Sequence, residues 1–196
     1  GGLIGVLFQA MKRAAFSNEA GLGSAAIAHA AAKTGEPVRE GVVAMIGPFI
    51  DTILVCTMTA LAILITNAHL KGGNGVEVTA AAFGTVLSPD IGNLVLTGMV
   101  AVFAYSTIIS WSYYGERCVE YLFGDAGIKP YRIVYVLVII FGAVISLDRV
   151  IGFADMMLLS MAFPNIIGSI LLAPKVRRQV RDYQLRLKNG EIKPVV

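Results

Sequence analysis

Long apolar runs separated by short polar segments dominate the pattern of this chain. Four of them approach the roughly twenty residues that a helix needs to cross about 30 Å of hydrocarbon. A shorter apolar run opens the chain and is followed at once by Lys12 and Arg13. The pattern predicts an all-α membrane protein with about four and a half membrane helices. The opening run covers residues 1–11, and the four long runs cover 41–66, 91–114, 131–147 and 150–173.

Composition points to lipid as the main solvent. Hydrophobic residues make up 56% of the chain and charged residues 15%, and the mean hydropathy is +0.73. A soluble domain of 196 residues needs more charge than this to cover its surface. The two cysteines, Cys56 and Cys118, lie far apart and match no disulfide or metal pattern, so we expect free packing thiols.

The distribution of Lys and Arg predicts the orientation. If the opening run ends in the cytoplasm, every one of the sixteen Lys and Arg residues except Lys71 and Arg149 falls on the inner side. Because positive charge concentrates in cytoplasmic segments, this arrangement is favoured. Residues 1–174 then form a membrane domain, and residues 175–196 form a basic cytoplasmic tail that includes Lys193. A basic tail can also indicate nucleic-acid binding, but no binding fold accompanies this one.

Asp51 is the clearest polar group at membrane depth. It lies about 15 Å along a helix that begins near residue 41. An ionised and unpaired Asp would be costly there, so it should face a cavity, a partner or a cation. Pro48 disturbs the helix just before it and frees backbone carbonyls, which are good ligands for Na⁺. The alternative is an Asp that is protonated or hydrogen-bonded between helices for structure alone.

A second polar cluster lies in the string FAYSTIISWSYYGERC. Ser106 and Ser110 are one helical turn apart, as are Thr107 and Trp111, so each pair shares a face. Hydroxyls with an aromatic wall one turn away suit a small polar ligand. Alternatively, the hydroxyls bond back to carbonyls of their own helix and Trp111 belongs to an interfacial aromatic belt.

The polar connections also carry local signals. Ser17, Asn18 and Glu19 are expected to cap a short helix, and Gly21 and Gly23 allow tight turns or close packing. Such small-residue stretches suit elements that slide or rock, although a capping motif needs no function. The connection 70–90 contains an Ala-rich patch that predicts a short helix on the outer side. It is either an idle connection or an extracellular lid.

Enzyme signatures are missing from the sequence. There is no Gly-rich phosphate loop, GxSxG turn, paired-His motif or CxxC. We therefore expect no enzyme and no cofactor apart from a coupling ion. Asp155 and Asn165, two polar points in the last apolar run, are interpreted as packing contacts.

Three strings resemble the alanine/glycine:cation symporter family: FSNEAGLGSA, EPVREGVVAMIGPFIDTILVCTMTALAIL and FAYSTIISWSYYGERCVEYLFG. The resemblance covers residue 1 to about residue 174. It implies the C-terminal portion of a leucine-transporter-like inverted-repeat helical bundle, from the end of the sixth core helix to the tenth. It also implies a multi-pass protein of a bacterial or archaeal plasma membrane that imports alanine or glycine with Na⁺, or with H⁺ in some relatives. The start at Gly1, without Met, predicts an N-terminally truncated fragment.

The same resemblance implies roles for individual residues. Thr107 and Trp111 would line the substrate pocket, and Ser106 and Thr107 would supply hydroxyl ligands of one Na⁺ site. Asp51 would join the other Na⁺ site, and the first two glycines would be a remnant of the unwound sixth helix.

Other functions compete with this hypothesis. One alternative is a symporter of the same fold with another small substrate or with H⁺ coupling. From a different class, a cation channel or a structural membrane subunit is possible, but a channel predicts a continuous polar stripe, and the chain shows separate clusters.

Overall fold

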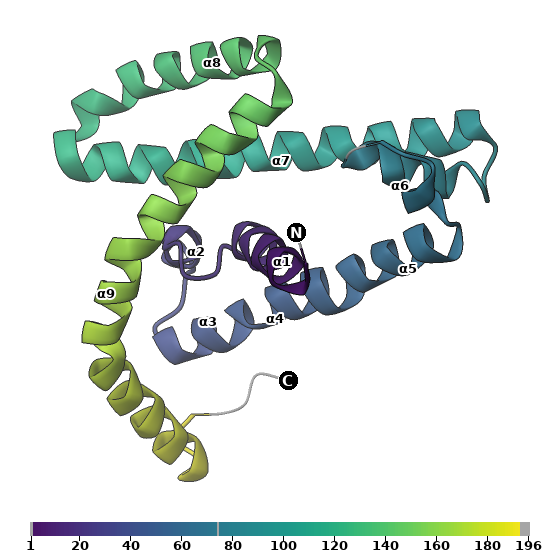
Figure 1. The fold of residues 1–196 in the computed structure, drawn as a ribbon. Helices are drawn as coiled ribbons and strands as arrows, with labels where there is room; N and C mark the ends of the chain where they lie inside the picture. Colours follow the sequence, from purple (N-terminus) through teal and green to yellow (C-terminus); the bar gives the residue numbers. More distant parts are fainter. Residues whose placement is uncertain (1, 74, 193–196) are drawn as a thin grey trace. The chain divides into compact units, whose positions relative to one another are not determined.

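The computed structural model describes residues 2–73 and 75–192, and every element within them is helical. This confirms the predicted all-α class. Gly1 and Lys193, which entered the expectations above, lie outside the described residues. The elements are α1 (Leu3–Ser17), α2 (Ser24–His29), α3 (Pro37–Ala44), α4 (Ile46–Pro48), the π-helix η1 (Phe49–Cys56), α5 (Thr57–Ile65), the 3₁₀-helix η2 (Ala68–Leu70), α6 (Val76–Phe83), α7 (Pro89–Phe123), the 3₁₀-helix η3 (Asp125–Gly127), α8 (Ile128–Val144) and α9 (Leu147–Lys188) (Figure 1).

Four stretches in the described part of the chain are long and apolar enough to cross a membrane, and each overlaps one predicted run. Their most apolar windows are almost fully exposed, with 0% buried in three of them and 6% in the fourth. So much exposed apolar surface would be unfavourable in water, whereas lipid chains can cover it. The stretches are Pro37–Ile65, Asp90–Phe123, Asp125–Val144 and Leu147–Lys188.

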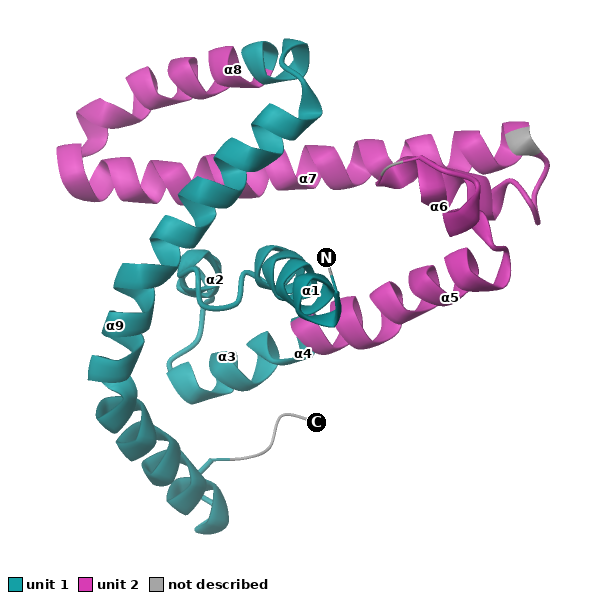
Figure 2. Cartoon of the chain, in the orientation of Figure 1, with its two compact units in different colours: residues 1–47, 140–196 teal, residues 48–139 magenta. Residues whose placement is uncertain are grey.

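The chain divides into two compact units (Figure 2). The first combines residues 1–47 with residues 140–196, and the second comprises residues 48–139. The first unit therefore joins the two ends of the chain, which are far apart in sequence.

In the first unit, α9 is the long scaffold. It has 42 residues and contains Pro164 and Pro174 without ending at either. At 1.5 Å per residue, its path is about 63 Å long, well beyond the thickness of the hydrocarbon. The apolar run and the basic tail as far as Lys188 therefore belong to one helix. The predicted division at residue 174 remains a prediction about the membrane edge, because the helix passes it without a break.

In the second unit, α7 and α8 are consecutive helices joined by a short turn. α7 continues to Phe123, past the predicted end of its apolar run at residue 114. Gly124, with a φ of +69°, ends it, and η3 leads into α8. The hydroxyl of Tyr135 on α8 donates a hydrogen bond of 2.9 Å to the carbonyl of Ile108 on α7. The two helices therefore pack against each other.

The short helix expected within residues 70–90 is present as α6. It contacts both α5 and α7, and Ala82 on it is buried. Its end approaches α7 closely, because a Cβ on Gly92 would lie 3.4 Å from the backbone nitrogen of Gly84. The connection is thus a packed part of the unit.

Candidate functional site

Asp51 lies in an irregular part of the first membrane stretch. Pro48 ends α4, and the next eight residues form the π-helix η1 before α-helical geometry resumes at Thr57. Proline lacks the N–H that an α-helix needs, so a disturbance at this point is expected. Asp51 is half-buried in the first turn of η1. The predicted disturbance is confirmed, and π-helical turns occur frequently at functional sites.

Thr107 and Trp111 lie one turn apart on α7, inside its apolar run. Thr107 is exposed, whereas Trp111 is half-buried. The Trp111 ring meets the Tyr114 ring edge-on, with 5.6 Å between the ring centroids. Aromatic pairs prefer this edge-to-face geometry, which limits the rotation of the indole. The pair therefore combines an exposed hydroxyl position with a fixed aromatic wall, while its role in substrate binding stays a prediction.

The serine hydroxyls of the cluster bond back to their own helix. Ser106 donates to the carbonyl of Phe103 at 2.9 Å, and Ser110 donates to the carbonyl of Ser106 at 3.0 Å. This is the local pattern that the alternative interpretation described. A hydroxyl that donates its proton keeps lone pairs that can still coordinate a cation. A Na⁺ role for Ser106 therefore remains compatible with these bonds, and it stays a prediction.

Asp51 and the cluster on α7 belong to separate segments of the second unit. α6 contacts both α5 and α7, and Figure 1 shows these two helices as arms joined through α6. The sequence hypothesis assigned Asp51 to one Na⁺ site and Ser106 with Thr107 to another, and both assignments stay predictions. No group of three or more His, Cys, Asp or Glu that could hold a metal occurs among the described residues.

Sequence reasoning missed the acidic residue that anchors the end of the α7–α8 hairpin. Glu116 is only 8% exposed. Arg132 of α8 donates two hydrogen bonds to its carboxylate, from Nε to Oε1 at 2.6 Å and from Nη2 to Oε2 at 2.9 Å. The preceding Gly115 leaves room for Tyr131, whose ring and hydroxyl would overlap any Cβ at that position. The available signal was a glycine beside an acidic residue within the aromatic string SWSYYGER.

An interruption separates α1 from α2. The backbone takes left-handed conformations at Glu19 (φ +51°), Gly21 (φ +77°) and Gly23 (φ +94°). Glycine adopts positive φ without the steric penalty of a side chain, so the two glycines permit this path. The tight turns predicted for these glycines are confirmed.

The structure corrects two expectations about this stretch. Asn18 is the C-cap of α1, and Gly23 is the residue before α2, so the Ser17–Asn18–Glu19 string does not cap a new helix. The reason is that α1 continues until the first left-handed residue, Glu19, and carries Ser17 as its last residue. Gly2 is the N-cap of α1, so the interruption lies well after the glycines at the start of the chain.

Three contacts join the N-terminal part of the chain to α9. In the order of the N-terminal residues, each contact lies farther toward the C-terminal end of α9. Lys12 and Arg13 pair with Asp155. Gly23 lies against Asn165, whose Oδ1 would be 3.1 Å from an added Cβ. The packing role expected for Asn165 is therefore supported, and Asp155 makes ion pairs instead of simple packing contacts.

The last contact in this series is the pair of Glu36 and Arg186. The Arg186 guanidinium donates to the two oxygens of Glu36 at 2.7 and 2.9 Å. These bonds hold the pKa of the Glu36 carboxyl below its usual range, although burial opposes the shift. Glu36 is the residue before α3, so the pair ties the start of that helix to the far end of α9.

These contacts bear on the expected position of the first two cations. About thirty residues of α9 separate Asp155 from Arg186, which corresponds to about 46 Å along the helix. α1 runs through Lys12 and Arg13 instead of ending before them, so both cations belong to the helix and not to the connection that follows it. The side of the membrane on which they lie stays a prediction.

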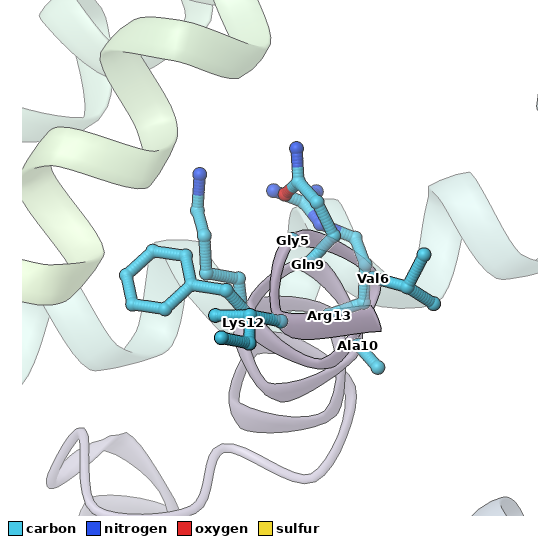
Figure 3. A pocket seen from close by; sticks show the side chains of 8 residues that line it. Gly5, Val6, Gln9, Ala10, Lys12 and Arg13 are labelled. Carbon is cyan, nitrogen blue, oxygen red and sulfur yellow. The ribbon is translucent and has the colours of Figure 1, made fainter. Parts of the chain in front are cut away.

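A hollow of about 1000 Å³ lies elsewhere in the first unit (Figure 3). Its lining residues are all on α1, from Ile4 to Arg13. Because a single helix lines it, it is an open face of α1 and does not have the convergent polar groups of a binding site.

Comparison with known proteins identifies relatives along the whole chain. The Sodium:alanine symporter family matches residues 1–196. "Sodium/alanine symporter AgcS" of Methanococcus maripaludis is 46% identical over 96% of this chain and 42% of its own length. An "Uncharacterized transporter" of Haemophilus influenzae is 45% identical over 90% of this chain and 39% of its own length. "Probable sodium/glutamine symporter GlnT" of Bacillus subtilis is 35% identical over 97% of this chain and 40% of its own length.

The chain thus spans about two fifths of the length of these curated relatives. No solved structure gives a significant match. The family matches the full chain, and it is the family that the sequence strings resemble. The four membrane-length helices are consistent with a family of membrane transporters. The chain belongs to the sodium:alanine symporter family.

Proposed function

We propose that the protein imports a small neutral amino acid, alanine or glycine, by symport with Na⁺ across a bacterial or archaeal plasma membrane. Membership of the sodium:alanine symporter family supports transport of this class. The name of the archaeal relative, 46% identical, supports Na⁺ and alanine. The activity proposed is that of the complete gene product, because the chain covers two fifths of its relatives.

The observation that carries the proposal is the pairing of Thr107 with Trp111 on α7. A small amino acid has one short apolar side chain and two charged groups. The Thr107 hydroxyl can accept a hydrogen bond from its ammonium group or donate one to its carboxylate. The indole of Trp111, held edge-on to Tyr114, supplies a wall next to the side chain. Such a wall leaves room for a hydrogen or methyl group and excludes longer side chains.

Cation coupling would use two parts of the second unit. Ser106 and Thr107 supply hydroxyl oxygens on α7, and Asp51 supplies a carboxylate on η1. In a π-helical segment such as η1, the backbone carbonyls accept hydrogen bonds from residues five positions later instead of four. Carbonyl oxygens left unpaired by this change are suitable ligands for a hard cation such as Na⁺. The membrane potential contributes about 2.3 kcal/mol per elementary charge per 100 mV, so each Na⁺ carried inward can drive accumulation.

The interrupted helix α1–α2 supports an inverted-repeat transporter fold of the leucine-transporter type. Discontinuous helices recur in such folds, and they place backbone polar groups where an irregular backbone is tolerated. The left-handed residues Glu19, Gly21 and Gly23 form an interruption of this kind. We propose that the cytoplasmic end of α9 carries the basic tail, since the tail remains the densest group of cations.

The proposal is tested by uptake of radiolabelled alanine into proteoliposomes that contain the complete gene product. We expect accumulation above equilibrium when Na⁺ is higher outside, and none without the gradient. The Thr107→Ala variant should lower Na⁺-driven uptake at least about tenfold, which corresponds to about 1.4 kcal/mol. Thr97→Ala is the matched control, because it removes the same groups from an exposed position on the same helix.

Contrary results would identify the competing functions. Uptake that only equilibrates would indicate a channel. Accumulation of glutamine without alanine would indicate another substrate, as in the name of the Bacillus relative. Accumulation driven by a pH gradient without Na⁺ would indicate H⁺ coupling.

A second test addresses substrate size. Trp111→Ala should raise leucine uptake relative to alanine uptake, because it removes the aromatic wall. Trp111→Phe keeps part of the wall and should give an intermediate ratio. An unchanged ratio in Trp111→Ala would remove Trp111 from the substrate site.

A further inference from the structure

Three charged side chains join α1 to α9. The Lys12 ammonium lies 2.9 Å from Oδ2 of Asp155. The Arg13 guanidinium donates to the same carboxylate, with Nη2 at 2.6 Å from Oδ2. The side chains of Asp155 and Lys12 are only 17% and 24% exposed, whereas that of Arg13 is 48% exposed. Two adjacent residues of α1 thus pair with one carboxylate of α9.

These ion pairs lie beside a small apolar contact between α1 and α9. None of the residues of α1 is buried. Ala15 and Phe16 of α1 face Leu158 and Leu159 of α9 across a gap of about 10 Å³, which barely holds one water. Leu22, after the end of α1, lines the same gap and is only 3% exposed. The most buried part of the contact therefore lies beyond α1 itself.

The backbone just after α1 is suited to act as a hinge. Its left-handed residues include Gly21, where an added Cβ would meet no atom within 4 Å, so its surroundings leave room for backbone rotation. On the other side of the interruption, Gly23 is in close contact with Asn165 of α9. α1 can therefore turn about the interruption while the contact at Gly23 keeps the start of α2 on α9.

The charges themselves favour a contact that opens and closes. Asp155 lies within the apolar run of α9, where an unpaired carboxylate is costly, so the closed arrangement is well defined. Two cations for one carboxylate leave a surplus positive charge, and Arg13 is already half exposed to solvent. Ionic contacts can be exchanged for water when a path to solvent opens, whereas interlocked side chains must be unpacked.

We propose that Lys12, Arg13 and Asp155 form a reversible ionic latch between α1 and α9, and that this latch opens in every transport cycle. The inference rests on the proposed function, because it identifies elements that move during transport. When the latch is closed, it fixes α1 beside α9 and sets the position of the interruption. When it opens, α1 rotates about residues 18–21, while Leu22 and Gly23 stay on α9.

Cross-linking tests whether α1 and α9 separate during transport. Ala15→Cys and Leu158→Cys are combined in the complete gene product after replacement of every native cysteine, including the exposed Cys56 and Cys118. These two positions line the same gap and leave all three charges of the latch intact. We expect a short bifunctional thiol reagent to lower Na⁺-driven alanine uptake at least about tenfold, and a reductant to restore it.

The matched control places both cysteines on α9 by combining Leu158→Cys with Ala162→Cys, one turn apart. This bridge should leave uptake unchanged. Unchanged uptake in the fully cross-linked α1–α9 pair would overturn the latch. Failure of that pair to cross-link would also overturn it, because the contact on which it rests would be absent. Loss of Na⁺-driven uptake in the unmodified protein would instead contradict the proposed function.

Charge exchange tests the ionic nature of the contact. Lys12→Asp and Asp155→Lys should each slow uptake several-fold, and the double variant should recover at least half of the unmodified rate. The exchange keeps one carboxylate and two cations in the contact, since Arg13 is unchanged, and moves the carboxylate from α9 to α1. Additive losses in the double variant would contradict a direct pairing.

Discussion

The α7–α8 hairpin and the α1–α2 stretch both place helical segments beside a partner helix, but by different physical means. In the hairpin, Gly115 receives the Tyr131 ring, and Glu116 is enclosed beside Arg132. In the other stretch, α1 is joined to α9 by ion pairs next to left-handed glycines. Steric interlocking resists displacement, whereas ionic contacts can be exchanged for water. We therefore expect the hairpin to stay rigid and α1 to move.

This difference fits the roles proposed for the two regions. Trp111 lies about one turn from Gly115, so a rigid hairpin end keeps its ring in a constant position. A size-selective wall has to be rigid, because a wall that moves admits larger substrates. A gate, in contrast, has to change position at small energetic cost. The comparison predicts different responses to substitution in the two regions.

The largest effect on stability is expected at Gly115. Its Cβ in Gly115→Ala would overlap the Tyr131 ring, so the substitution should destabilise the protein by about 2–3 kcal/mol. Gly98→Ala on the same helix has no atom within 4 Å of the added Cβ and should be neutral or stabilising by up to about 1 kcal/mol. Thermal unfolding in detergent measures both. Equal midpoints would contradict the interlocked hairpin.

A smaller effect is expected at Gly23. Gly23→Ala meets both a left-handed φ and the Asn165 side chain, so we expect a loss of about 1–2 kcal/mol. Gly21→Ala shares the left-handed φ but has open space around it. The difference between the two variants, measured by the same thermal unfolding, isolates the contact with α9. A larger loss at Gly21 would show that the packing contact is unimportant.

Removing the charge of Glu116 should cost about 1 kcal/mol, because Glu116→Gln weakens two charge-assisted hydrogen bonds to Arg132. The control is Glu120→Gln, which weakens a pair with Arg117 in which the carboxylate side chain is more exposed than that of Glu116. Surface pairs of this kind contribute a few tenths of a kcal/mol, so this variant should resemble the unmodified protein. Indistinguishable thermal midpoints for the two variants would show that the enclosure of Glu116 adds nothing.

The smallest effect is a pH dependence at the start of α3. Arg186 lowers the pKa of Glu36, so their pairing is fully present above the unfolded pKa of about 4.3. It is lost as the pH falls through the lower folded value. Hydrogen exchange of the first turn of α3 should therefore accelerate only in the acidic range. Glu36→Gln should remove this pH dependence, and persistence of the dependence would assign it to another group.

Much of the helical framework could be predicted from the sequence, and some local details could not. The four apolar runs and the short helix of residues 76–83 were predicted because hydrophobic length and Ala content act locally. The ends were less accurate. α7 continues to Phe123 because the polar residues after Tyr114 still pack on α8, as Glu116 does with Arg132. The cap expected at Ser17 was wrong because nothing interrupts α1 before Glu19.

The candidate site was predicted at the level of residue type and helix face. The spacing of Thr107 and Trp111 places both on one side of any helix, and the disturbance beside Pro48 follows from its missing N–H. The hydroxyl bonds of Ser106 and Ser110 match the local alternative that the sequence also allowed. The enclosure of Glu116 could not be predicted, because it depends on a partner sixteen positions later on another helix.

By itself, the sequence determined that the chain is helical, that it has four membrane-length runs, that its family is recognisable and which helix faces carry hydroxyls. All of these depend on the order of neighbouring residues. Only the tertiary structure decided which charges meet. Arg13 and Asp155 are 142 positions apart, and Glu36 and Arg186 are 150 positions apart. Electrostatic pairing depends on distance in space, and that distance is set by the packing of α1 and α3 along α9.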